Sequence, residues 1–159
     1  TVVNFKTDLT KTKMGTFNSI NEWVEFRYKE IKLKDSEAEA KEWKAAWEEA
    51  LRDGQSEFRD DFNAQFETVG LRLRDGAADA EYTAVFVVDQ INVPEGFGNK
   101  PVELAGKLLF YDKAGKLLST VEILDVKSFP SGGIPMRVRS GFRRAGGHTG
   151  EKIFLMYFK

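Results

Sequence analysis

The sequence contains no cysteine, and this absence excludes disulfide bridges, thiol nucleophiles and thiolate metal ligands. It contains a single histidine, His148, so a metal site would have to consist almost wholly of carboxylates, and no Asp-x-Asp-x-Asp calcium loop occurs. No apolar run reaches the roughly 20 residues that cross a bilayer. We therefore expect no cofactor, no metal and no membrane span within this chain.

A strong charge of either sign is also absent. The formal net charge is -1, whereas proteins that bind nucleic acid usually carry a basic field. The basic C-terminal part around Phe142 does combine cations with an aromatic ring, as surfaces for single-stranded nucleic acid do. The acidic stretch at residues 36–67 would repel the same polyanion, so we predict no nucleic-acid partner.

The chain is rich in large apolar side chains. Hydrophobic residues make up 42% of it, including 13 Phe and 3 Trp, which excludes a disordered protein. At 159 residues it is long enough to bury roughly 70% of its unfolded surface without a metal or a disulfide. We predict one domain over residues 1–159.

Helical periodicity is clearest in a long central segment. Asp35 and Ser36 suit the start of a helix, and acidic residues occupy its polar faces. Gly54 lies inside the segment, where it costs about 1 kcal/mol relative to alanine, but the apolar stripe keeps its phase across it. We predict one amphipathic helix over residues 36–68 with a bend or weak point at Gly54. The stripe consists of Ala40, Trp43, Trp47, Leu51, Phe58, Phe62 and Phe66.

Four segments have the composition of strands, at residues 2–7, 82–88, 102–111 and 117–126. The last two are joined by Asp-Lys-Ala-Gly-Lys, a turn sequence typical of a hairpin. A second, shorter helix is predicted between the first strand and the long helix, capped by Ser19 or Asn21.

The order of these elements indicates an α+β fold. We predict a two-layer sandwich, in which a four-stranded mixed sheet carries the long helix and a C-terminal helix on one face. We expect the opposite face to be partly exposed to solvent or used for binding. Because side chains alternate along a strand, Tyr111, Thr120 and Glu122 are expected on that face.

The segment at residues 139–152, RSGFRRAGGHTGEK, looks most like a site because it gathers glycines, cations and the histidine. It is not a Walker loop, since Glu151 precedes Lys152 and an isoleucine occupies the hydroxyl position. Two interpretations stay open at this point, a close-packed basic helix and an irregular loop whose amides bind an anion. In the second case the ligand-binding residues would be Arg143, Arg144, Gly147, His148 and Lys152.

No constellation of catalytic residues is apparent. His148 lacks a serine or threonine in a nucleophile-elbow context, and the acidic residues of the long helix fit a solvated face. Two loops, at residues 94–101 and 128–135, instead carry the aromatic side chains Phe97 and Phe129, which we predict as contacts to a partner.

A resemblance adds a cellular context. The run Ala80–Val88 and the hairpin Tyr111–Leu118 resemble an A-x-Y-x-x-x-V-x-V strand and a D-x-x-G-K-x-L hairpin in uncharacterised exported proteins and lipoproteins of Bacteroides-type bacteria. At fold level the chain is also similar to the amino-terminal domain of the Tol translocation protein and to curli-secretion lipoproteins. These families imply an exported, periplasmic or outer-membrane-associated protein without catalytic residues. A signal peptide or lipidated cysteine would then lie outside this chain.

The sequence therefore favours a non-enzymatic binding or structural module of the bacterial cell envelope. It would recognise a protein or surface component through a sheet face and the loops at residues 94–101 and 128–135. The alternative is a small-molecule enzyme or an anion-binding protein that uses residues 139–152. Assembly through an exposed sheet edge is a third interpretation.

Overall fold

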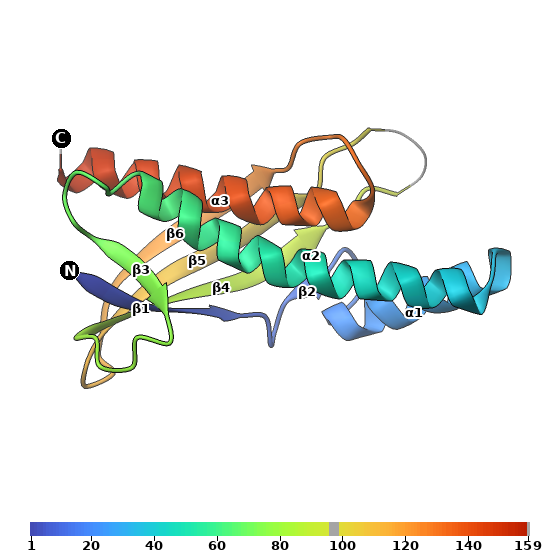
Figure 1. The fold of residues 1–159 in the computed structure, drawn as a ribbon, viewed down its shortest axis with the longest axis horizontal. Helices are drawn as coiled ribbons and strands as arrows, with labels where there is room; N and C mark the ends of the chain where they lie inside the picture. Colours follow the sequence, from blue (N-terminus) through green and yellow to red (C-terminus); the bar gives the residue numbers. More distant parts are fainter. Residues whose placement is uncertain (96–98, 159) are drawn as a thin grey trace.

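The computed structural model describes residues 1–95 and 99–158 and shows a mixed sheet with helices beside it (Figure 1). Its strands are β1 (Val2–Asp8), β2 (Lys13–Met14), β3 (Arg72–Asp75), β4 (Tyr82–Asn92), β5 (Glu103–Asp112) and β6 (Leu117–Lys127). Its helices are α1 (Ile20–Lys34), α2 (Glu37–Ala64) and α3 (Ile134–Tyr157). The α+β class predicted from the sequence is confirmed.

The sheet has six strands, so the prediction of four was wrong. Its order is β3-β1-β4-β5-β6, and the short β2 pairs with β4. β1 is parallel to both β3 and β4, whereas β4, β5 and β6 are joined as antiparallel neighbours. The sheet is therefore open, with β3 at one edge and β6 at the other.

The two strands missing from the prediction have little strand character of their own. β2 is two residues long, and three of the four residues of β3 are charged. β3 is held from outside, because the amide side chain of Asn63 accepts a hydrogen bond from the Leu73 N–H at 2.7 Å and donates one to the Leu73 carbonyl at 2.9 Å. A tertiary contact thus specifies this strand.

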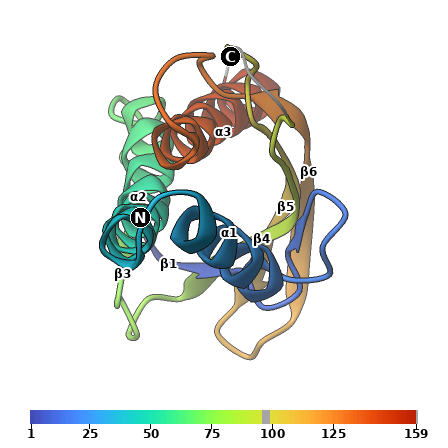
Figure 2. The ribbon, with the colours of Figure 1, turned by 90° about the vertical axis from the view of Figure 1, so that its right-hand side faces the viewer.

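The helices lie together on one side of the sheet (Figure 2). Phe58 of α2 stacks between Phe5 and Phe86, with ring centroids 5.6 and 4.1 Å apart. Phe142 of α3 meets the same Phe86 edge-on at 5.8 Å. The prediction that the long helix and the C-terminal helix share one face is therefore confirmed.

The start of each of the first two helices follows the expected capping chemistry. Ser19 accepts a hydrogen bond from the Glu22 N–H, and Ser36 accepts one from the Glu39 N–H, both at 3.1 Å. α2 ends at Ala64 and not at residue 68, because the chain turns there to reach β3. The helix continues through Gly54, as its periodicity predicted.

Glycines allow α2 and α3 to approach each other closely. A Cβ placed on Gly146 would lie 2.0 Å from the carbonyl oxygen of Phe58, and one on Gly150 would lie 3.0 Å from that of Phe62. On the α2 side, a Cβ on Gly54 would lie 3.2 Å from the Cβ of Phe142. Gly54 is thus a contact point between the helices, which explains a residue that the sequence suggested as a bend.

The sheet register agrees with the predicted far-face positions of Tyr111, Thr120 and Glu122, and it places Tyr111 opposite Thr83 of β4. The register places Thr120 opposite Leu109 and Glu122 opposite Lys107, and these residues alternate with the buried Leu108 and Ile123 of the helix-facing side.

Within the described residues, no helix is long and apolar enough to cross a membrane.

We expect Gly146→Ala to destabilise the fold by about 3 kcal/mol or more, because backbone atoms of α2 occupy the space of the new methyl group. Gly147→Ala is the matched control, since its Cβ would meet only Asp61 at an ordinary 3.8 Å. The control should be neutral or stabilising by up to about 1 kcal/mol. Denaturant unfolding of the two variants measures the difference, and equal stabilities would contradict the packing argument.

Candidate functional site

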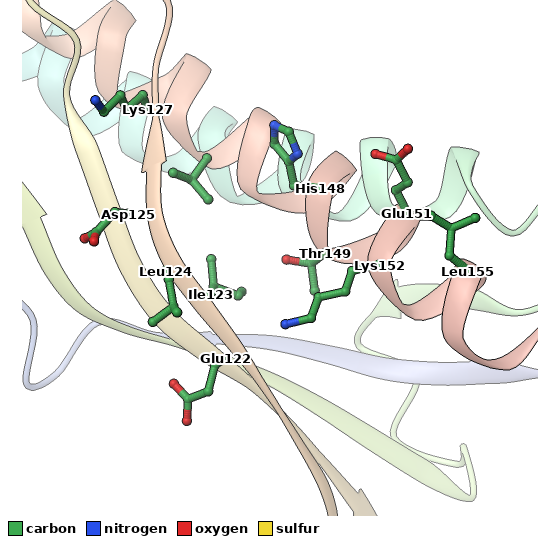
Figure 3. Close-up of a pocket in the computed structure, with 11 residues that line it drawn as sticks. Glu122, Ile123, Leu124, Asp125, Lys127, His148, Thr149, Glu151, Lys152 and Leu155 are labelled. Carbon is green, nitrogen blue, oxygen red and sulfur yellow. The ribbon is translucent and has the colours of Figure 1, made fainter.

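A groove of about 660 Å³ lies between β6 and α3 (Figure 3). β6 contributes the whole run of residues 122–127 to its lining, and α3 contributes residues from its C-terminal half. The α3 residues are His148, Thr149, Glu151, Lys152 and Leu155. The groove therefore joins an edge of the sheet to the neighbouring helix.

The groove lies along a sparsely covered strand. Of the eleven residues of β6, only Ile123 is buried. Leu124 is 74% exposed, and Leu155 on the facing helix is 47% exposed. The Leu124 side chain points away from α3, as that of Glu122 does (Figure 3), so the exposed leucines lie on the two elements that line the groove and not face to face across it. Exposed apolar side chains that lie near one another can mark a surface that another molecule covers.

The strand is irregular beside the groove. Between the pairs Gly106–Ile123 and Leu104–Val126, β6 has one residue more than β5, which is a β-bulge. Asp125 sits in this bulge with φ of 40°, the left-handed region that aspartate tolerates better than most residues. Because a bulge bends its strand, it sets the course of β6 along the groove.

The charged side chains of the groove are not paired with one another. Lys152 extends toward β6, whereas Glu122 and Asp125 point away from α3 (Figure 3). Among the described residues, no ion pair involves Lys152 or His148. The buried hydroxyl of Thr149 donates to the Ala145 carbonyl at 2.7 Å, so it is engaged within the helix. Lys127 pairs with Glu103 at 3.7 Å, so among the described lysines of the groove lining Lys152 is the one without an ion pair, and Glu151 is a further carboxylate of that lining.

The structure distributes the predicted ligand residues over different sides of α3. Arg143 pairs with Asp61 of α2 at 3.1 Å, and Gly147 also faces Asp61. Arg144 lies over the ring of Phe129, 4.8 Å from its centroid. His148 and Lys152 line the groove. These five residues do not converge on one point, and only the last two share the groove.

The segment at residues 139–152 is helical throughout, as part of α3. Its amide groups therefore serve the hydrogen bonds of the helix, and a nest of free amides does not form there. In the parts of the chain with described coordinates, no three His, Cys, Asp or Glu side chains are placed to hold a metal ion.

The predicted partner contacts lie in two loops. Phe97 falls outside the described residues. Phe129 follows two residues after the groove residue Lys127, the residue is 53% exposed, and Arg144 lies over its ring. Phe129 therefore lies near one end of the groove, and its role as a contact stays a prediction.

An ion-pair cluster fixes the opposite side of α3. Arg139 donates to Glu57 Oε1 at 2.7 and 3.0 Å and lies 3.6 Å from Asp53. The hydrogen bond to Glu57, followed by its charge, raises the pKa of Arg139 above its ordinary value, so this cation stays charged. The basic residues of α3 thus lie on two sides of the helix: Arg139 and Arg143 pair with acidic residues of α2, and Lys152 lies beside β6.

Leu124 and Leu155, the exposed leucines of the groove lining, were not among the site residues predicted from the sequence. A signal was available in β6, where Leu117, Leu118 and Leu124 do not follow a clean alternation of apolar and polar positions. A strand with apolar residues on both faces is usually central in a sheet and covered on both sides. Because β6 is an edge strand, some of its apolar residues are left without cover.

Comparison with known proteins identifies no family. No protein family matches this chain, and no curated protein sequence matches it. Among solved structures, the PelC dodecamer from Paraburkholderia phytofirmans is similar over 60% of this chain and 73% of that chain, with 12% identity and a TM-score of 0.41. This is a distant likeness of part of the fold, and we carry no residue role over from it. The resemblance to Bacteroides-type, Tol and curli-secretion proteins stays a prediction.

We expect Leu124→Ala to change the free energy of unfolding by less than about 0.5 kcal/mol, because its side chain is mostly exposed. The neighbouring Ile123→Ala should cost about 2 kcal/mol or more, since Ile123 is buried against the helix layer. Denaturant titration of both variants measures the contrast. A large loss for Leu124→Ala would show that this residue serves the fold and not a surface.

Proposed function

We propose that this protein is a non-enzymatic binding module of the bacterial cell envelope that recognises a partner protein. The observation that supports this most is the groove between β6 and α3, whose apolar wall residues Leu124 and Leu155 stay exposed. Phe129 adds an exposed aromatic residue in the loop at residues 128–133, which is shorter than the predicted 128–135 because α3 begins at Ile134. We propose that these exposed side chains contribute to the surface that a partner covers.

The chemistry of the groove fits a peptide segment. Its apolar wall offers area to aliphatic or aromatic side chains, which supply most of the free energy in such contacts. Lys152 offers a charge-assisted hydrogen bond to one carboxylate. We therefore propose a partner segment that combines apolar residues with an acidic residue.

The envelope location is supported by the resemblance of Ala80–Val88 and Tyr111–Leu118 to exported proteins. We expect the complete gene product to be recovered in the periplasmic or outer-membrane fraction of its native bacterium. Immunodetection after cell fractionation measures this, with a known cytoplasmic enzyme as the marker of leakage. Recovery with that marker would contradict the envelope assignment and leave the groove proposal standing.

A ligand-binding alternative is favoured by one observation, that His148 and Lys152 both line the groove. A small acidic molecule would then occupy the place that we assign to a protein segment. Arg143 and Gly147 would take no part, because they face α2.

Random peptides displayed on phage provide a defined probe of the groove. We expect selected clones to bind the native protein and to lose at least about tenfold in affinity for Leu155→Asp and for Lys152→Glu. The matched controls are Leu33→Asp and Lys29→Glu on α1, which make the same changes at exposed positions far from β6. The controls should bind like the native protein.

Two results would contradict the proposal. Peptide binding that is equal for all four variants would place recognition elsewhere. Displacement of every clone by inorganic phosphate, with loss of phosphate binding in Lys152→Glu, would favour the small-ligand alternative. Circular dichroism of each variant confirms that the fold is retained.

A further inference from the structure

We infer that the partner binds as an extended strand that pairs with the free edge of β6 at Ser119–Ile123 and continues beside α3. This inference rests on the proposed function, since it concerns the same surface. It specifies the conformation of the partner segment and the backbone groups of β6 that recognise it.

The two edges of the sheet differ in their access to another strand. β3 is four residues long and carries Arg72, Arg74 and Asp75. Short, charged edge strands disfavour pairing with a further strand. β6 is eleven residues long and ends the sheet on the other side. Among the described residues, no strand pairs with the outer N–H and C=O groups of β6, so β6 is the edge at which a strand can be added.

Two irregularities mark the part of β6 that is regular enough to pair. One lies near Leu118, between the pairs Phe110–Ser119 and Tyr111–Leu117, and the other is the bulge that contains Asp125. Between them the register with β5 is unbroken over the five residues Ser119–Ile123. An added strand is therefore expected to form its ladder there and to stop at the bulge.

The side chains of this stretch permit close approach of a second backbone. It contains no proline, and Glu122 is its one charged residue. Ser119 and Thr120 are exposed, and Val121 is half-buried. Serine, threonine and valine fit a pleated surface, and they do not repel an incoming strand as rows of lysine do on protected edges.

The groove begins where the regular stretch ends. Glu122 and Ile123 belong both to Ser119–Ile123 and to the groove lining, which continues to Lys127. A segment that leaves the ladder at Ile123 thus passes between the bulged part of β6 and α3. Its next side chains come near Lys152, which no described carboxylate pairs with, so an acidic residue there gains the favourable contact.

Hydrogen exchange on a peptide complex tests the inference directly. The probe is a phage-selected peptide whose affinity depends on Leu155 and Lys152. We expect it to slow amide exchange in Ser119–Ile123 by about tenfold or more, on alternate residues, because alternate N–H groups of an edge strand point outward. The buried strand β4 serves as the internal control, and its exchange should stay unchanged.

N-methylation of the same peptide provides the second measurement. Methylation at alternate positions should weaken binding by about fivefold or more each, since it removes ladder hydrogen bonds, while the intervening positions should tolerate it. A peptide that binds the groove as a helix, or that binds without protecting Ser119–Ile123, would overturn strand addition and leave the proposed function intact. Failure of the phage selection to yield any peptide whose affinity depends on Leu155 and Lys152 would remove both the strand addition and the proposed function. Protection by a second copy of the protein in the absence of peptide would replace the partner with self-association.

Discussion

The close contact between α2 and α3 is the constraint on which the other features of the molecule depend. The helices approach until a single methyl group on Gly146 would collide with the Phe58 carbonyl. This contact fixes the rotation of α3 about its axis, and Arg139 and Arg143 reinforce it through acidic residues of α2. Because that side of α3 packs against α2, Lys152 and Leu155 lie on the side of α3 that faces β6. The groove is therefore a consequence of helix packing and not of an irregular loop.

Much of the fold could be predicted from local patterns, and the exceptions have a common cause. The stripe from Ala40 to Phe66 specified α2, and the turn before Leu117 specified the hairpin, because both signals lie in neighbouring residues. β3 could not be found in this way, since charged residues dominate it and the side chain of Asn63 holds it in place. The role of Gly54 also depends on a residue distant in sequence, Phe142.

The candidate site shows the same division between local and distant information. Residues 139–152 drew attention through composition, but composition does not say which residues share a side of a helix. With helical spacing, Arg139, Arg143, Gly146 and Gly150 form one row, which faces α2. Arg144, His148 and Lys152 form another row, toward β6 and its following loop. The second wall of the groove comes from a strand that no pattern within this segment could reveal.

The bulge at Asp125 connects the stability of the sheet edge to its use. An edge strand that pairs freely along its whole length invites uncontrolled association, and bulges are a common protection against it. Here the irregularities leave only Ser119–Ile123 regular, which is enough for a short ladder but too little for extensive sheet growth. For the strand partner that we propose, further affinity would come from side chains beyond the ladder, because Leu155 and Lys152 line the groove beside α3. Under the proposed strand addition, a short edge next to a groove would favour partners that fit both parts over other strands, since specificity is a difference between affinities.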